Sequence, residues 1–190
     1  MNPPLTPQTT LQRVLEIFPG AQRALFRRYH IGGCSSCAFQ PGETLQELCA
    51  RNGGIDPGEM IDHIQSSHDQ DAKLLLAPAE LARLRQQRPS LRLLDVRTRE
   101  EHESVRIDGS ILMSQSTMQE ILGQWPREEL FIIYDHSGRQ ALDAAAYFMG
   151  HGFANVRCLR GGIDAWSLEV DSRLPRYTLD AGASDGHRPE

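Results

Sequence analysis

Beyond residue 75, short apolar runs alternate with helical stretches, and this alternation constrains the fold more than any other feature. The runs are LRLLDV at 91–96, ELFIIY at 129–134 and NVRCL at 155–159. Compact, continuously apolar runs of this kind are typical of strands buried in a parallel sheet. A helical stretch, QALDAAAYFMGHG at 140–152, separates the last two runs. The pattern predicts an α/β domain over residues 75–178, with a parallel sheet and helices on both faces.

The first part of the chain carries helical patterns instead. Helix-start residues precede its apolar stretches, namely Thr10, Thr44 with Glu47 in capping-box spacing, and Asp56 before Pro57. We therefore expect a small all-α domain over residues 1–68, with the segment IGGCSSC on the turn between its second and third helices. The polar stretch SSHDQDAK at 66–73 lacks periodicity and predicts a linker, assigned to residues 69–74. The small polar residues of 179–190 predict a disordered tail.

Charge and hydropathy narrow the range of partners. The chain has 190 residues and a net charge of −5. An acidic balance argues against a nucleic-acid partner or an anionic membrane surface, since both usually require a basic face. The sequence has no apolar run as long as a membrane span, and its N-terminus lacks a basic segment followed by an apolar one. We expect a cytoplasmic protein with neither a nucleic-acid nor a membrane partner.

Three spaced segments of the second domain form a recognisable series. They are LLDVRTREEHESVRIDGSI, the loop DHSG after a buried strand, and GHGFANVRCLRGGIDAW. The opening and closing motifs are carried by Asp95, Arg97, Glu101, Gly161, Gly162 and Trp166. The series resembles a single rhodanese-type sulfurtransferase domain. The ending WSLEVDSRLPRY also resembles the tail of single-domain sulfurtransferases and of rhodanese modules fused to sulfur-carrier activating enzymes.

The resemblance implies a cysteine at the start of the loop that follows the central strand. Backbone N–H groups and a helix N-terminus there stabilise an anion, which lowers the thiol pKa and favours a thiolate. The thiolate then takes a sulfane sulfur as a persulfide. In this chain the cysteine position falls on Asp135, or on Tyr134 if the loop is one residue longer. A carboxylate cannot form a persulfide, so we expect no thiosulfate sulfurtransferase activity through this loop.

The degenerate loop consists of Asp135, His136, Ser137, Gly138, Arg139 and Gln140. The carboxylate of Asp135 either occupies the anion cradle or caps the following helix, and we favour the cap. We expect His136 to be an exposed loop residue, because no partner nucleophile is identifiable. Arg139 is equally consistent with anion binding and with plain solvent exposure.

The chain has four cysteines, Cys34, Cys37, Cys49 and Cys158. We expect Cys49 and Cys158 to be buried, because each lies within an apolar pattern. The CSSC pair follows two glycines and precedes a helix start, where thiolates are favoured. The segments YHIGGCSSC and ETLQELC resemble a small helical domain, over residues 8–66, that is associated with hybrid-cluster and redox proteins. The resemblance implies a redox-active or metal-binding cysteine pair.

Three chemistries remain open for Cys34 and Cys37. Dithiol–disulfide or persulfide chemistry ranks first. Metal binding ranks second, either as a zinc site completed by His30 and Cys49 or as an iron–sulfur cluster shared by a homodimer. An inert pair ranks third.

The function predicted from the sequence is sulfur trafficking or thiol redox chemistry at Cys34 and Cys37. Its partner would be a sulfane-sulfur donor or a thiol protein. The alternative is a non-enzymatic binding or regulatory protein that uses the rhodanese fold as a scaffold, since fold alone does not decide function.

Overall fold

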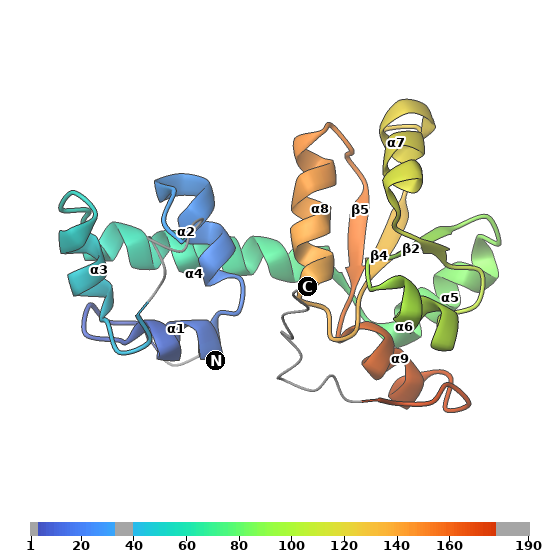
Figure 1. The fold of residues 1–190 in the computed structure, drawn as a ribbon, viewed down its shortest axis with the longest axis horizontal. Coiled ribbons are helices and arrows are strands. Elements are labelled where there is room, and N and C mark those ends of the chain that lie inside the picture. The colour runs from blue at the N-terminus through green and yellow to red at the C-terminus, as the bar shows by residue number, and fades with distance from the viewer. Residues whose placement is uncertain (1–3, 33–39, 178–190) are drawn as a thin grey trace, which may run out of the picture.

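The computed structural model describes residues 4–32 and 40–177, which form a helical unit followed by an α/β unit (Figure 1). The helical unit contains α1 (Leu11–Ile17), α2 (Ala21–Tyr29), α3 (Leu45–Arg51) and α4 (Pro57–Leu74). The strands that follow are β1 (Leu75–Leu76), β2 (Arg92–Asp95), β3 (Ile111–Leu112), β4 (Phe131–Tyr134) and β5 (Val156–Leu159). The remaining helices are α5 (Pro78–Gln87), α6 (Arg99–Ser104), α7 (Gln115–Gln124), α8 (Gln140–Gly150) and α9 (Gly162–Glu169).

The sheet is parallel, with the strand order β1-β5-β4-β2-β3. One face packs against α7 and α8, where Ile121 and Phe148 join a buried cluster with Ile133. The other face packs against α5 and α9, where Leu81 and Ile163 join a second buried cluster with Ile132. The predicted parallel sheet with helices on both faces is therefore confirmed. Each apolar run predicted to be a strand contains one, whereas β1 and β3 are two-residue strands with no pattern of their own.

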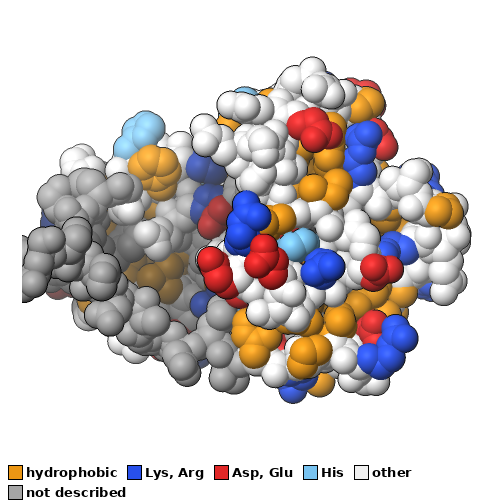
Figure 2. All heavy atoms as spheres, turned by 45° about the vertical axis from the view of Figure 1, so that its right-hand side comes forward, with side chains coloured by type: hydrophobic (Ala, Val, Ile, Leu, Met, Phe, Trp, Pro, Cys, Tyr) orange, Lys and Arg blue, Asp and Glu red, His pale blue; other side chains and the backbone are white. Residues whose placement is uncertain are grey.

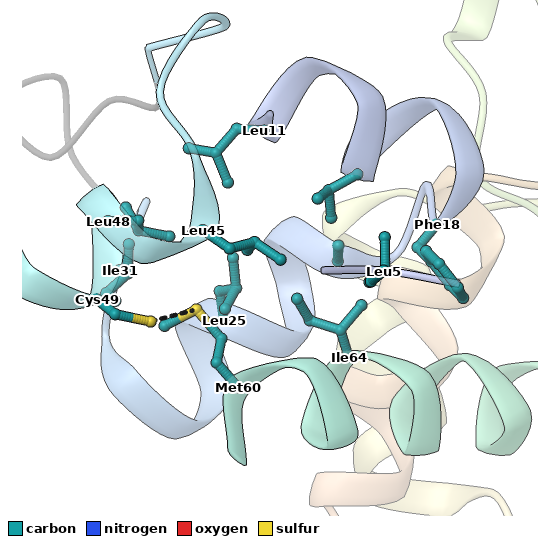
Figure 3. Packing of buried hydrophobic residues seen from close by; sticks show 12 residues of the cluster. Leu5, Leu11, Phe18, Leu25, Ile31, Leu45, Leu48, Cys49, Met60 and Ile64 are labelled. Carbon is teal, nitrogen blue, oxygen red and sulfur yellow. Dashed lines mark hydrogen bonds between the residues drawn. The ribbon is translucent and has the colours of Figure 1, made fainter. Parts of the chain in front are cut away.

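The helical unit has its own hydrophobic core, in which side chains from all four of its helices meet (Figure 3). Its helix starts follow the sequence pattern. The Thr10 hydroxyl accepts from the N–H of Arg13, and Thr44 and Glu47 form a reciprocal capping box. Caps of this kind satisfy backbone donors that a helix leaves unpaired, each worth about 1 kcal/mol.

The predicted linker is wrong as an irregular segment, because α4 continues through it to Leu74. The helix begins at the Asp56 cap, buries Met60 and Ile64 in the helical core, and reaches the sheet, where Leu74 packs against the buried cluster. The polar second half of α4 has no hydrophobic stripe. Side-chain contacts such as that of Asp71 with Arg23 stabilise it instead. The predicted tail at 179–190 lies outside the described residues. Within the part that is described, no helix is both long enough and apolar enough to cross a bilayer.

Candidate functional site

Two buried aspartates lie at the carboxyl ends of neighbouring strands. Asp95 ends β2 and pairs in register with Tyr134, which ends β4, and Asp135 follows directly. Both carboxyl-bearing residues are almost fully buried, at 0% and 2% exposure. Buried charges need compensating partners, and the two residues find them in different ways.

The carboxylate of Asp135 is held by backbone N–H groups. It accepts hydrogen bonds from the amide N–H of Gly138, from that of Arg139 at 3.0 Å and from that of Gln140 at 2.8 Å. Gln140 is the first residue of α8, so the carboxylate lies at this helix N-terminus and inside the loop at once. The two interpretations weighed from the sequence, cradle occupant and helix cap, use the same hydrogen bonds.

The residues of the closing Gly161-Gly162 motif pack against the backbone of the loop that begins at Asp135. The N–H of Ile163 donates to the carbonyl of Asp135 at 2.9 Å, and the N–H of Asp164 donates to that of His136 at 3.2 Å. Gly162 has φ +61°, and a Cβ there would lie 2.4 Å from the Asp135 carbonyl oxygen. Only glycine permits this close approach without strain, so the GG motif fixes the path of the loop.

His136 is half-buried rather than exposed, contrary to expectation, because the chain returns over it near its C-terminal end. Its ring packs on that of Tyr177 with centroids 4.6 Å apart. Its Nδ1 atom is buried and has no hydrogen-bond partner among residues 4–32 and 40–177. Ser137, Arg139 and Gln140 are exposed, and Gly138 is buried with φ +89°.

The carboxylate of Asp95 is held by side chains. Arg97 donates to it from Nε at 2.9 Å and from Nη2 at 2.6 Å, and the Tyr134 hydroxyl donates at 2.8 Å. The Nδ1 atom of His102 lies 2.8 Å away. Burial alone would raise the pKa of Asp95, but the hydrogen bonds from Arg97, His102 and Tyr134 outweigh it and hold that pKa below its usual range.

Tyr177 connects this network to the loop. Arg97 Nη1 donates to its hydroxyl at 2.6 Å, and the hydroxyl donates to Glu101 at 2.7 Å. Burial, together with the hydrogen bond to Glu101, raises the pKa of Tyr177 to about 12. The sequence placed Arg97 and Glu101 in a motif but did not single out His102, the Tyr134 hydroxyl or Tyr177. Tyr177 does close the RLPRY ending, which was the signal available for it.

The cysteines fall into two classes. Cys49 and Cys158 are buried free thiols, as predicted. Burial raises the pKa of Cys49 above its usual range, and burial with the nearby Asp135 charge raises that of Cys158 to about 12. The Sγ of Cys49 lies 3.5 Å from the Sδ of Met60 inside the helical core (Figure 3). Cys34 and Cys37 lie outside the described residues.

A cavity of about 1460 Å³ lies between the helical unit and α8. Ser137, Gly138 and Arg139 of the loop line it from the α/β side, and Gly32 lines it from the helical side. Within residues 4–32 and 40–177, the structure has no cluster of three or more His, Cys, Asp or Glu side chains arranged to hold a metal ion. Cys34 and Cys37, the two thiols predicted to bind a metal, lie outside those ranges.

Comparison with known proteins assigns the α/β unit. The sequence profile of the rhodanese-like domain matches residues 77–169. A sulfurtransferase from Allochromatium vinosum is 32% identical over 75 residues, which are 40% of this chain and 70% of that protein. The probable adenylyltransferase/sulfurtransferase MoeZ of Mycobacterium tuberculosis is 30% identical over 104 residues, 54% of this chain and 26% of that protein.

Among solved structures, a rhodanese-like domain protein from Staphylococcus aureus is similar with a TM-score of 0.45 and 22% identity. The similarity covers 55% of this chain and 98% of that one. The chain spans only 26% to 38% of the length of the adenylyltransferase/sulfurtransferase relatives that it matches. The profile match begins at residue 77 and therefore does not include the N-terminal helical unit. Through residues 77–169, the chain belongs to the rhodanese-like domain family.

Proposed function

We propose that this chain is a cytoplasmic sulfur-trafficking protein whose thiol chemistry takes place at Cys34 and Cys37, while the rhodanese-like domain supplies a binding surface. Sulfurtransferases among the relatives support sulfur chemistry at the level of the family. The assignment of the chemistry to Cys34 and Cys37 rests on the loop and on the burial of the Cys49 and Cys158 thiols.

The single observation that carries the proposal is the position of the Asp135 carboxylate. It fills the ring of N–H donors from Gly138, Arg139 and Gln140, where a thiolate or persulfide would otherwise be stabilised. Asp135 contains no sulfur to carry. A sulfane sulfur handled by this protein must therefore be held by another residue.

The buried thiols are poor candidates for that role. Nucleophilic attack on a sulfur donor requires an accessible thiolate. Cys158 is fully buried with a pKa raised to about 12, and Cys49 is 1% exposed with a pKa that burial also raises. Both remain protonated at neutral pH and out of reach of a donor. Cys34 and Cys37 are the remaining sulfhydryls of the chain.

The place of Gly32 favours an encounter between the CxxC pair and the loop. Gly32 lines the same cavity as Ser137 and Gly138. Cys34 follows Gly32 by two residues in the sequence. A donor such as thiosulfate would be attacked at its outer sulfur by the Cys34 thiolate. The new S–S bond forms the persulfide, the S–S bond of the donor breaks, and sulfite leaves with the electron pair.

The test is mass spectrometry of the full chain after incubation with thiosulfate or polysulfide. We expect a mass increase of one sulfur atom that maps to Cys34 or Cys37 and is released by a reducing thiol. The Cys34→Ser/Cys37→Ser variant should lose it, and the matched Cys49→Ser/Cys158→Ser variant should retain it. Inert thiols at both CxxC positions would favour the alternative of a non-enzymatic binding protein.

Anaerobic purification separates thiol chemistry from metal binding. A visible absorption spectrum would show an iron–sulfur cluster, and metal analysis would show zinc. A stoichiometric metal that disappears in the Cys34→Ser/Cys37→Ser variant would replace persulfide chemistry with a metal site at the same residues. Absence of metal together with persulfide formation is the result that we expect.

A further inference from the structure

The cavity between the two units contains an excess of positive charge in a chain of net charge −5. Four Arg and Lys side chains line it, namely Arg23, Arg27, Lys73 and Arg139, against two carboxylates, Asp71 and Asp143. Charged side chains of both signs gather where the two lobes of the molecule meet (Figure 2). Such a local excess attracts anions.

Both carboxylates of the cavity are engaged by one cation. Arg23 on α2 donates to Asp71 on α4 and to Asp143 on α8, so it joins the helical unit to the α/β unit. Its side chain is 15% exposed. The charges of Asp71 and Asp143 are therefore directed at Arg23 and compensate the other cations weakly.

The other three cations of the cavity have no carboxylate partner among the described residues. Arg27, Lys73 and Arg139 form no ion pair with any residue that the structure describes, and each is exposed. They come from three different elements, α2, α4 and the loop before α8, and all line the same cavity. Cations that converge on one space from separate elements are arranged to meet a shared ligand rather than one another.

The cavity also has an apolar wall. Phe26 and Met149 line it and are exposed at 48% and 44%, and Leu142 and Ala146 of α8 also line it. Exposed large apolar side chains beside convergent polar groups are typical of ligand pockets. The volume of about 1460 Å³ exceeds the range of about 300–1,000 Å³ usual for small-molecule sites. An inorganic ion would leave most of this space and the apolar wall unused.

We infer that this cavity binds an organic anion with an apolar segment. Its carboxylate or phosphate groups pair with Arg27, Lys73 and Arg139, and its apolar segment lies on Phe26, Leu142 and Met149. The inference concerns binding and does not depend on the chemistry proposed for Cys34 and Cys37. The two proposals therefore fail separately.

The experiment is a fluorescence titration of the full chain with anilinonaphthalene sulfonate, followed by competition. The competitors are sebacate, a ten-carbon chain with two carboxylates, decyl phosphate, and uncharged decanediol. We expect sebacate or decyl phosphate to displace the dye at least tenfold more effectively than decanediol. Comparing sebacate with decyl phosphate shows whether the cavity prefers carboxylate or phosphate groups. Decanediol competing as well as both anions would overturn the inference.

Variants locate the binding. Arg27→Gln/Lys73→Gln should weaken anion binding at least tenfold, whereas Arg83→Gln/Arg88→Gln, within and directly after the far helix α5, should leave it within twofold. Phe26→Asp, which adds a carboxylate at an exposed position, should weaken it as well. Cys34→Ser/Cys37→Ser should bind normally. Unchanged affinity in both the Arg27→Gln/Lys73→Gln and the Phe26→Asp variants would overturn the assignment to this cavity.

Discussion

Asp95 and Asp135 occupy nearly equivalent places at the ends of the adjacent strands β2 and β4, yet their surroundings differ in kind. Asp95 is compensated by side chains, chiefly Arg97, His102 and Tyr134. Asp135 is compensated by the backbone of its own loop. Side-chain compensation depends on residue identity, because removal of one partner leaves another charge buried. Backbone compensation depends on the path of the chain, which survives replacement of the side chain that it holds.

The Asp95 network is therefore a structural centre of the fold, whereas the loop around Asp135 has the geometry of an anion-binding site. The Asp95 network joins β2, β4, α6 and the C-terminal segment through Tyr177, and every member is engaged. The N–H groups around Asp135 would stabilise any anion of suitable size at the same point. The loop therefore has the geometry of an anion-binding site, and the carboxylate of its own Asp135 occupies it.

The sharpest test of this contrast removes one charge from each site. Asp95→Asn should destabilise the protein by about 3–5 kcal/mol, because it leaves the Arg97 guanidinium buried and uncompensated. Asp135→Asn should cost only about 1 kcal/mol, the value of a helix cap, because no buried cation is left behind. Urea denaturation measures both. Asp108→Asn, an exposed aspartate nearby, is the control and should change stability by less than about 0.5 kcal/mol. Equal costs at Asp95 and Asp135 would contradict the distinction.

Changing the backbone path should disturb the loop even though no charge is altered. Gly162→Ala places a Cβ against the carbonyls of Asp135 and His136 at a positive φ. We expect a loss of about 2–4 kcal/mol from strain and overlap. Gly123→Ala in α7 is the matched control, since its site is open, and it should stabilise by about 0.5–1 kcal/mol. Thermal unfolding compares them, and a neutral Gly162→Ala would show that the GG motif does not fix the loop.

Introducing a sulfur atom into the loop tests directly whether its backbone N–H groups stabilise a thiolate. In a Cys34→Ser/Cys37→Ser background, Asp135→Cys should give a thiol with a pKa at least one unit below the ordinary value of about 8.5, because three N–H groups face the sulfur position. Ser137→Cys places a thiol on the exposed side of the same loop and should titrate normally. The pH dependence of alkylation by iodoacetamide measures both values. Identical profiles would mean that the N–H groups do not stabilise a thiolate.

The sequence predicted those parts of the fold whose pattern is local. Strands β2, β4 and β5 are continuous apolar runs, and α8 has an apolar face, so each is visible within a short window. The second half of α4 is not, since it is polar and is stabilised by contacts such as that of Asp71 with Arg23, 48 residues away. Tertiary contacts overrode the absence of local periodicity there.

The candidate site likewise combines features predicted from a local pattern with contacts that depend on the tertiary fold. The six loop residues are contiguous, and the family resemblance placed the first loop position at Asp135, or at Tyr134 for a loop one residue longer. The burial of His136 could not be anticipated, because Tyr177 reaches it from 41 positions downstream. Arg97 and Tyr177 are 80 residues apart, and no spacing rule connects them. The sequence motifs identified individual residues of the candidate site, and only the fold showed which other residues they contact.

The smallest expected effect concerns Tyr177, the residue that links the two aspartate sites. Tyr177→Phe removes the hydroxyl that accepts from Arg97 and donates to Glu101, and should cost about 1 kcal/mol at neutral pH. Because the pKa of Tyr177 is raised in the folded protein to about 12, its contribution is complete below the unfolded value of about 10. That contribution is lost as the pH rises from about 10 to 12, so the stability difference between wild type and Tyr177→Phe should shrink over this range. Tyr147→Phe, at an exposed tyrosine, serves as the control. A difference that stays constant with pH would place the Tyr177 hydroxyl outside the Asp95 network and leave the two aspartate sites independent.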